Sequence, residues 1–428
     1  MAVGDRVYIA DKETLDRTHA NTVGILAAIG QGQHGMLKRY GIKIEKNNSG
    51  AAARVEYILD AVGMTPAHMD FANGVFDYGD WEGVAFVDEA HNYPCMVKSD
   101  GTEDYKLDPN NYKLRKGTDL PSDVDNTAYA GNAMAAFVGG WLCQYETDTH
   151  EYIIWCSEQW DENYHAYHRM DEQGNVRPGF YRRIYTPGLV DNVARSISGL
   201  QPMASKTATD EETAIKANGS VWNHTAWSEY NYVTALLKIM GKSENCQAVF
   251  GNGNMNGYVN DASVFYGVLP AGTMDDKGQF FGYNTDNQQI KVFHTEAMWG
   301  DQWERLVGLI CDNGKVMVSP YGPYNWTGDG YHQIIDYVSE GICVAGEGGK
   351  SGYPSKTIMT QYGRFNGNKS GGSTTTYLCD YFWINPDIVA VALVGGNANN
   401  GANCGPGYVN LNNSRSNANW NIAPGISC

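Results

Sequence analysis

Charge is scarce in this sequence, and positive charge is scarcer still. Only 18% of the 428 residues are Asp, Glu, Lys or Arg, and the formal net charge is −17. Proteins that bind nucleic acids or anionic membrane surfaces use clustered Lys and Arg to neutralise phosphate, and no stretch of this chain is dense in them. We therefore expect no nucleic-acid partner, and we interpret the acidity as a source of solubility.

Long apolar runs are also missing. The apolar run Val23–Ile29 is interrupted by Gly24, and it is far shorter than the roughly 20 residues that span a bilayer. The N-terminus has no signal-peptide pattern. We expect no membrane insertion and no export by the usual route. A protein of this kind would meet a cell surface after lysis or as part of a particle.

The sequence has no closely spaced pairs of cysteines. The nine cysteines are odd in number and widely spaced, and no CxxC occurs. A disulfide scaffold would be denser and even-numbered, so we expect reduced, mostly buried thiols in a protein that folds in a cytoplasm. They are Cys95, Cys143, Cys156, Cys246, Cys311, Cys343, Cys379, Cys404 and Cys428.

Motifs that carry catalysis or bind cofactors are missing too. The chain has no GxxxxGK[ST] and no GxSxG. His165 and His168 have HxxH spacing, but no further ligand pattern accompanies them, so we interpret them as part of a polar loop. The acids at 100, 104 and 108 are spaced too widely for a calcium loop. We therefore predict a protein that is not an enzyme and that needs no metal or cofactor.

The sequence is rich in Gly and Tyr, and it contains several short runs of β-branched residues. The 50 Gly and 28 Tyr predict a loop-rich fold with many turns. Short β-branched and aromatic runs separated by turn clusters predict strands. The fold class we expect is α+β, mainly β, with a mainly β middle domain over 38–195. The predicted strands are 84–87, 152–155, 180–185, 290–293, 305–310, 315–318 and 388–394, with a hairpin at Asn313-Gly314.

Four segments have the spacing of helices. The run 11–29 predicts a helix within an N-terminal attachment or oligomerisation segment, 1–37. Ser49 as N-cap, with the stripe Val55, Ile58, Leu59 and Val62, predicts a second helix that ends at Gly63. A short helix is predicted within 205–217, and a strong one over 228–240, with Gly241 as its stop.

The C-terminal tail, residues 395–428, is rich in Asn and Gly, and Arg415 is its only charged residue. Such polarity usually indicates disorder. Here an apolar strand precedes the tail, and apolar anchors such as Tyr408 and Trp420 interrupt it. Asn and Gly also adopt the backbone angles of tight loops. We therefore predict ordered loops pinned by a few buried side chains.

This tail resembles the variable region of proteins that diversity-generating retroelements diversify, such as phage tropism determinants. The stretches Trp299–Arg305 and Cys246–Asn254 are similar to the lectin-fold part of gut-phage tail proteins. The resemblance covers roughly 200–428 and extends upstream over 38–190. It implies a C-type-lectin-like domain, similar to formylglycine-generating enzymes in fold, over 196–428, with the variable region at about 395–428.

The resemblance also implies a function. We expect a phage tail or prophage receptor-binding protein that recognises a host cell-surface receptor, either protein or glycan. The implied protein is a homotrimer that contacts other phage tail proteins through its N-terminus, belongs to the virion (tail tip or fibre) and assembles in the bacterial cytoplasm. The implied receptor-binding residues are Asn397, Asn399, Asn400, Asn403, Tyr408, Asn410, Asn412 and Asn413, whereas 417–422 is interpreted as framework.

Three alternatives stay open at this point. A formylglycine-generating oxidoreductase shares the implied fold, but Cys404 and Cys428 come without a partner motif. A diversified bacterial surface adhesin would need an export signal. A calcium-dependent sugar lectin would need its ligand motif, and Gln201-Pro202-Met203 departs from QPD at the residue that would bind calcium.

Overall fold

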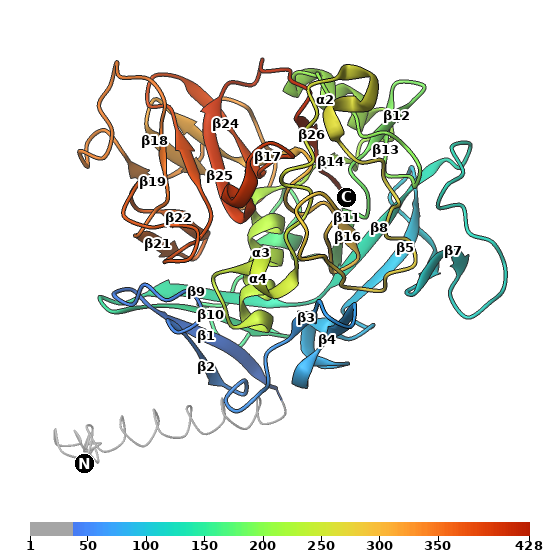
Figure 1. The fold of residues 1–428 in the computed structure, drawn as a ribbon, viewed down its shortest axis with the longest axis horizontal. Coiled ribbons are helices and arrows are strands. Elements are labelled where there is room, and N and C mark those ends of the chain that lie inside the picture. Colours follow the sequence, from blue (N-terminus) through green and yellow to red (C-terminus); the bar gives the residue numbers. More distant parts are fainter. Residues whose placement is uncertain (1–36) are drawn as a thin grey trace, which may run out of the picture. The chain divides into compact units, whose positions relative to one another are not determined.

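Strands dominate the fold, which confirms the predicted α+β, mainly β class. The computed structural model describes residues 37–428 (Figure 1). The predicted helix 11–29 and the segment 1–36 lie outside the described residues. Residues 39–428 form one compact unit. No described helix is both long and apolar enough to cross a membrane.

Three larger sheets carry the architecture. The first has the order β2 (Val55–Leu59), β1 (Arg39–Glu45), β10 (His150–Cys156), β9 (Trp141–Glu146). The second has the order β14 (Asn223–His224), β27 (Ile426–Ser427), β11 (Gly179–Arg183), β8 (Gly131–Val138), β5 (Asn92–Lys98), β6 (Glu103–Asp108), β7 (Asn111–Arg115). The third has the order β19 (His332–Asp336), β18 (Lys315–Val318), β17 (Trp303–Asp312), β24 (Val389–Gly395), β25 (Gly405–Asn413), β23 (Phe382–Ile384), β20 (Lys350–Gly352), and β26 (Ile422–Pro424) pairs with β17 in parallel.

Several smaller elements accompany these sheets. The two-stranded sheets are β3 (His68–Asp70) with β4 (Val75–Asp77), β12 (Gly188–Val190) with β13 (Val193–Arg195), β15 (Lys291–Val292) with β16 (Thr295–Glu296), and β21 (Thr357–Thr360) with β22 (Gly363–Asn366). The α-helices are α2 (Ala208–Lys216), α3 (Trp227–Gly241) and α4 (Cys246–Phe250). Short 3-10 turns are η1 (Gly79–Trp81), η2 (Ala85–Val87), η3 (Tyr167–Arg169), η4 (Ala262–Gly267) and η5 (Gly401–Asn403).

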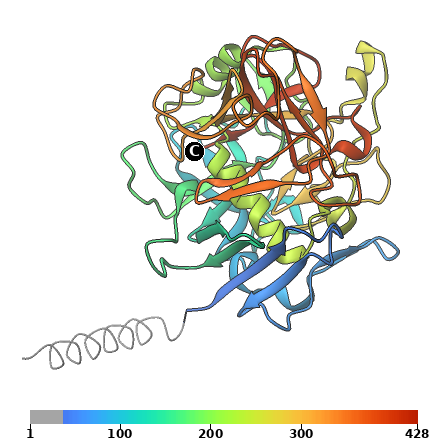
Figure 2. The same cartoon turned by 90° about the vertical axis from the view of Figure 1, so that its left-hand side faces the viewer.

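Helix α3 runs through the core. Nearly every one of its residues is buried, and it contacts β1, β10, β17 and β22, so it lies in the middle of the fold in both views (Figure 1, Figure 2). Because nearly all sides of α3 are buried, its stability comes from packing against the rest of the fold. The predicted helix 228–240 is therefore confirmed, although the left-handed residue that follows it is Lys242 and not Gly241.

Two local predictions are wrong. The segment predicted as a helix from Ser49 to Gly63 contains strand β2, which pairs with β1 in antiparallel register. Its apolar stripe does not share one buried face, because Val55 is buried whereas Val62 is 68% exposed. The predicted strand 84–87 is instead the turn η2. A four-residue apolar run has no period that distinguishes the two conformations.

Other local predictions are confirmed. The helix predicted within 205–217 is α2, and Thr207 caps it, since its hydroxyl accepts a hydrogen bond from the Asp210 backbone N–H at 3.2 Å. The hairpin between β17 and β18 turns at Asn313 and Gly314, both with positive φ. Eight of the nine cysteines are buried, and Cys428 is half-buried.

The predicted boundary between 38–195 and 196–428 falls directly after β13. Strands from both sides of it share one sheet, because β27 and β14 continue the order β11, β8, β5. The C-terminal strand β27 pairs with β11 through Ser427 and Arg182. The division into two domains stays a prediction, and the two regions are joined by a common sheet.

Candidate functional site

The tail forms one side of a cavity in which asparagine predominates. Strand β24 enters the tail, η5 turns the chain, and β25 returns beside β24 in the third sheet. A cavity of about 250 Å³ lies between this pair and the last loop, residues 414–421. Among residues 37–428, no charged side chain lines it. Its lining residues are Trp303, Trp383, Leu393, Asn397, Asn400, Tyr408, Asn410, Asn412, Asn413, Asn417, Asn419, Asn421 and Ile422.

The floor of the cavity is aromatic and buried. Trp303 on β17 and Tyr408 on β25 meet edge to face, with ring centroids 4.4 Å apart. Leu393 and Ile422 complete this small apolar cluster. Burial raises the pKa of the Tyr408 phenol, so it stays neutral. A packed floor of this kind holds the surrounding loops without depending on the identity of the rim residues.

The periodicity of β25 explains which side chains reach the cavity. Tyr408, Asn410 and Asn412 alternate with Val409 and Leu411, and alternate residues of a strand point to opposite faces. The first three line the cavity, whereas Val409 and Leu411 pack in the main core.

Several amides of the cavity hold the loop in shape. The Asn397 side-chain oxygen accepts from the Asn399 backbone N–H at 2.8 Å, and the Asn400 oxygen accepts from the Asn397 N–H at 2.9 Å. The Asn410 oxygen accepts from the Asn412 N–H at 2.9 Å and from the Asn413 amide at 3.0 Å. Such local bonds fix turns that carry little regular structure.

Other amides of the cavity have unused hydrogen-bonding capacity. Within residues 37–428, the side-chain amides of Asn412 and Asn421 make no hydrogen bond, and Asn400 uses only its oxygen. Each amide offers two donors and an acceptor. These three side chains are half-buried at the cavity. The arrangement can therefore bind an uncharged polar ligand by hydrogen bonds over an aromatic floor.

The structure brings together six of the eight residues predicted for receptor binding. They are Asn397, Asn400, Tyr408, Asn410, Asn412 and Asn413. Asn399 is exposed outside the lining, and Asn403 is held by the hydroxyl of Tyr353. Asn397 and Tyr408 are at most 2% exposed. A ligand would therefore contact them only from inside the cavity. The binding role of all eight residues stays a prediction.

The sequence interpretation left several lining residues out of the site. Asn417, Asn419 and Asn421, interpreted there as framework, line the cavity together with Trp303 and Trp383. These asparagines lie in the loop between β25 and β26, so no regular period in the sequence identifies them as lining residues.

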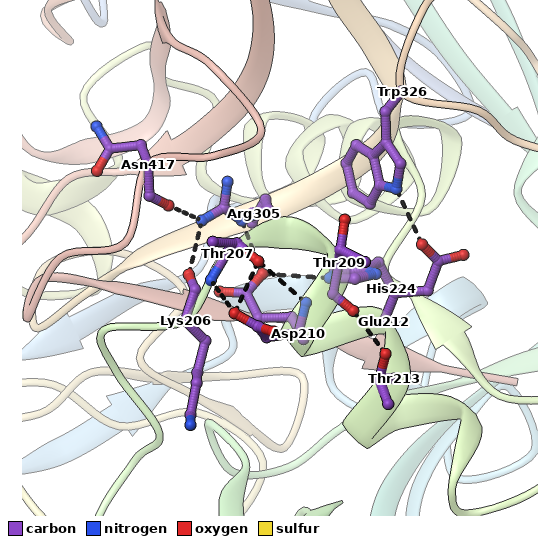
Figure 3. A network of polar contacts seen from close by, with 11 residues as sticks. Lys206, Thr207, Thr209, Asp210, Glu212, Thr213, His224, Arg305, Trp326 and Asn417 are labelled. Atoms are coloured by element: carbon purple, nitrogen blue, oxygen red, sulfur yellow. Dashed lines mark hydrogen bonds and ion pairs between the residues drawn. The ribbon is translucent and has the colours of Figure 1, made fainter.

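Arg305, which is part of a buried ion pair, contacts the loop 414–421 through the backbone of Asn417 (Figure 3). The Arg305 Nε lies 2.7 Å from Glu211 Oε2 on α2, and both side chains are fully buried. Arg305 also donates to the Asn417 backbone carbonyl at 2.9 Å. The Ala208 N–H donates to the Arg415 carbonyl at 2.9 Å. The position of residues 414–419 therefore depends on α2 and β17.

A buried carboxyl holds the start of β25. The Asp380 side chain accepts from the Gly407 N–H at 2.7 Å. A Cβ on Gly405 would lie 2.0 Å from the same carboxyl, so that position has no room for a side chain. Burial raises the pKa of Asp380 from its ordinary 3.8 to about 8.

Replacing Asp380 with asparagine should weaken the pH dependence of stability. Because the pKa of Asp380 is raised on folding, the folded chain holds more protons than the unfolded chain between about pH 4 and 8. Stability falls as the pH rises through this range, by up to about 1.4 kcal/mol per unit. Asparagine keeps an acceptor for Gly407 and removes the titration. Between pH 5 and 8, the change in unfolding free energy should shrink by about 2–4 kcal/mol.

Urea unfolding at the two pH values measures this change. The exposed Asp125→Asn variant is the control and should keep the pH dependence of the unaltered protein. An equal pH dependence in Asp380→Asn would mean that this carboxyl is ionised in the folded state.

The remaining sequence candidates form no second chemical centre. His168 stacks on Tyr232, with ring centroids 3.7 Å apart, and His165 stacks on Tyr167. In the part of the chain that the structure describes, no group of three or more His, Cys, Asp or Glu side chains is placed to hold a metal ion.

The two C-terminal thiols lie in different surroundings. Cys404 donates to the Asn397 carbonyl at 3.4 Å, whereas the Cys428 backbone pairs with Tyr181 beside β11. Burial raises the pKa of Cys404, and it raises that of Cys428 to about 12. A thiol with a raised pKa is a poor nucleophile and metal ligand, so this site gives no support to the oxidoreductase alternative.

These observations define a mainly β protein whose C-terminal strands form an uncharged, amide-lined cavity. No family model matches the chain, and no curated protein is similar to it in sequence. A solved structure titled Major Tropism Determinant U1 Variant is similar at 13% identity, over 79% of this chain and 72% of that chain, with a TM-score of 0.26.

Proposed function

We propose that this protein is a receptor-binding protein of a phage or prophage tail, and that the amide-lined cavity recognises a molecule on a host cell surface. The observation that carries the proposal is the set of half-buried amides with free hydrogen-bonding groups above a rigid aromatic floor. Binding surfaces use such a combination of adaptable polar groups and fixed aromatic rings.

The same arrangement suits diversification by a retroelement. The side chains of Asn400 and Asn412 project into the cavity and not into the core. Their replacement therefore changes what the cavity binds at little cost in stability. Asn codons are rich in adenine, and adenine-directed mutagenesis would act on them. In this proposal residues 196–428 form a C-type-lectin-like domain that presents the variable region 395–428.

The proposal includes an assembly. Three copies of the chain would form a homotrimer in the virion, with segment 1–37 bound to other tail proteins and the cavities facing the host. Several copies on one particle convert weak single contacts into firm attachment. Assembly in the bacterial cytoplasm agrees with the nine free thiols.

Binding of the fluorescently labelled full chain to a panel of intact bacterial strains tests this function. We expect saturable binding to a small subset of strains, and competition by unlabelled protein. The absence of saturable binding to any strain that the parent particle infects would contradict the receptor-binding role.

A further inference from the structure

A second loop lies directly beside the cavity. We call residues 258–266 the aromatic loop. Its Tyr258 N–H donates to the Ala398 carbonyl at 3.0 Å. The Tyr258 ring stacks on Trp420, with centroids 5.0 Å apart, and Tyr266 packs on the same indole at 5.2 Å. Since Asn419 and Asn421 on either side of Trp420 line the cavity, the aromatic loop continues the cavity's rim.

The aromatic loop presents apolar side chains to solvent. Phe265 is 54% exposed, and Val259 and Val264 are each 49% exposed. The loop is closed by backbone bonds from Val259 N–H to the Tyr266 carbonyl at 3.0 Å and from Tyr266 N–H to the Asp261 carbonyl at 3.0 Å. These side chains are therefore held on an ordered turn.

The turn has an unfavourable backbone conformation. Phe265 and Tyr266 have φ of 51° and 58°, in the left-handed region, which costs bulky L-residues free energy. Gly or Asn would adopt this conformation more easily. Phe265 is 54% exposed, so it gains only part of the stabilisation that full burial would give, and its accessible ring can contact a partner.

The chemistry of the combined surface favours a protein partner. Asp261 is the only charged residue between 251 and 274, so the aromatic loop offers apolar and aromatic area of the kind found at the centres of protein interfaces. A saccharide can stack its C–H face on the Phe265 ring, but it has no apolar side chain to cover Val259 and Val264, which are each 49% exposed. The free cavity amides match the backbone N–H and C=O groups of a peptide.

We propose that the receptor is a protein, one of whose loops places its backbone in the amide-lined cavity and an apolar side chain against Phe265 and Val264. The aromatic loop would be the constant part of this contact, outside the diversified tail. This inference rests on the proposed receptor-binding function.

The variant Phe265→Asn tests the contact. Asparagine suits the left-handed conformation, so the melting temperature should be unchanged or higher. Binding to intact cells of a strain that binds the unaltered chain should weaken by about tenfold or more. The control is Leu120→Asn at a position that is 59% exposed outside the aromatic loop, and it should bind as the unaltered chain does. Equal binding by Phe265→Asn would overturn the contact.

Treatment of the same cells tests the class of receptor. A broad-specificity protease should abolish binding, and periodate, which oxidises saccharide diols, should leave it intact. Loss with periodate and survival after protease would overturn the inference in favour of a glycan, while the proposed function would stand. If the unaltered chain binds none of the strains, the proposed function fails, and this inference fails with it.

Discussion

Replacing Arg305 with methionine should lower the free energy of unfolding by about 3–5 kcal/mol. Arg305 and Glu211 are both fully buried and lie 2.7 Å apart. Without the guanidinium, Glu211 would be a buried carboxylate whose remaining side-chain partner among residues 37–428 is the imidazole of His224, at 3.3 Å. Urea unfolding at pH 7 measures the loss. Because Arg305 also binds the Asn417 carbonyl, receptor binding should weaken in the same variant.

Two further variants separate the buried charge from other effects. Arg115→Met breaks an ion pair that is 40% and 25% exposed, and exposed pairs contribute about 1 kcal/mol or less. The double variant Arg305→Met/Glu211→Leu removes both charges and should recover most of the stability lost in Arg305→Met. A loss below about 1 kcal/mol in Arg305→Met would contradict a supporting role for this pair.

Replacing Asn412 with aspartate should weaken receptor binding by about 100-fold or more, because the ligand would bury a carboxylate that has no counter-charge in the cavity. Folding should tolerate the change, since Asn412 is half-buried and its amide makes no hydrogen bond within the described chain. The measurement is the dissociation constant on intact cells, together with the melting temperature of the variant.

Asn163→Asp is the matched control for this change. Asn163 is exposed and does not line the cavity, so its variant should bind as the unaltered chain does. Equal binding by Asn412→Asp would place the receptor contact elsewhere, even if the protein proved to be a receptor-binding protein.

Regular patterns in the sequence predict those helices and turns whose conformation depends mainly on neighbouring residues. The stripe over 228–240 predicts α3 because apolar residues recur at helical spacing on a segment that the fold buries. The Asn313-Gly314 pair predicts the β17–β18 turn because both residues adopt positive φ easily. The helix predicted at 49–63 fails because pairing with β1, a tertiary contact, determines the conformation of Val55–Leu59.

The candidate site is also only partly predictable from the sequence, because tertiary contacts determine which of its side chains are available to a ligand. Its composition points to the tail, and six predicted residues line the cavity. Which amides are free depends in part on partners that are distant in sequence. Asn403 is held by Tyr353, 50 residues away, and the loop that carries Asn417 is held by Arg305, 112 residues away. No local pattern contains such pairings, so the free amides could be identified only from the fold.

Deep sequencing of the coding region's 3′ end across a natural population, with its flanking DNA, tests the central claim most directly. We predict that substitutions cluster in codons 397–413, change adenines almost exclusively and match a nearby template repeat, while the codons for Trp303 and Arg305 stay fixed. Ordinary variation in these codons, with neither a template repeat nor a reverse transcriptase gene nearby, would contradict the account of a diversified receptor-binding surface.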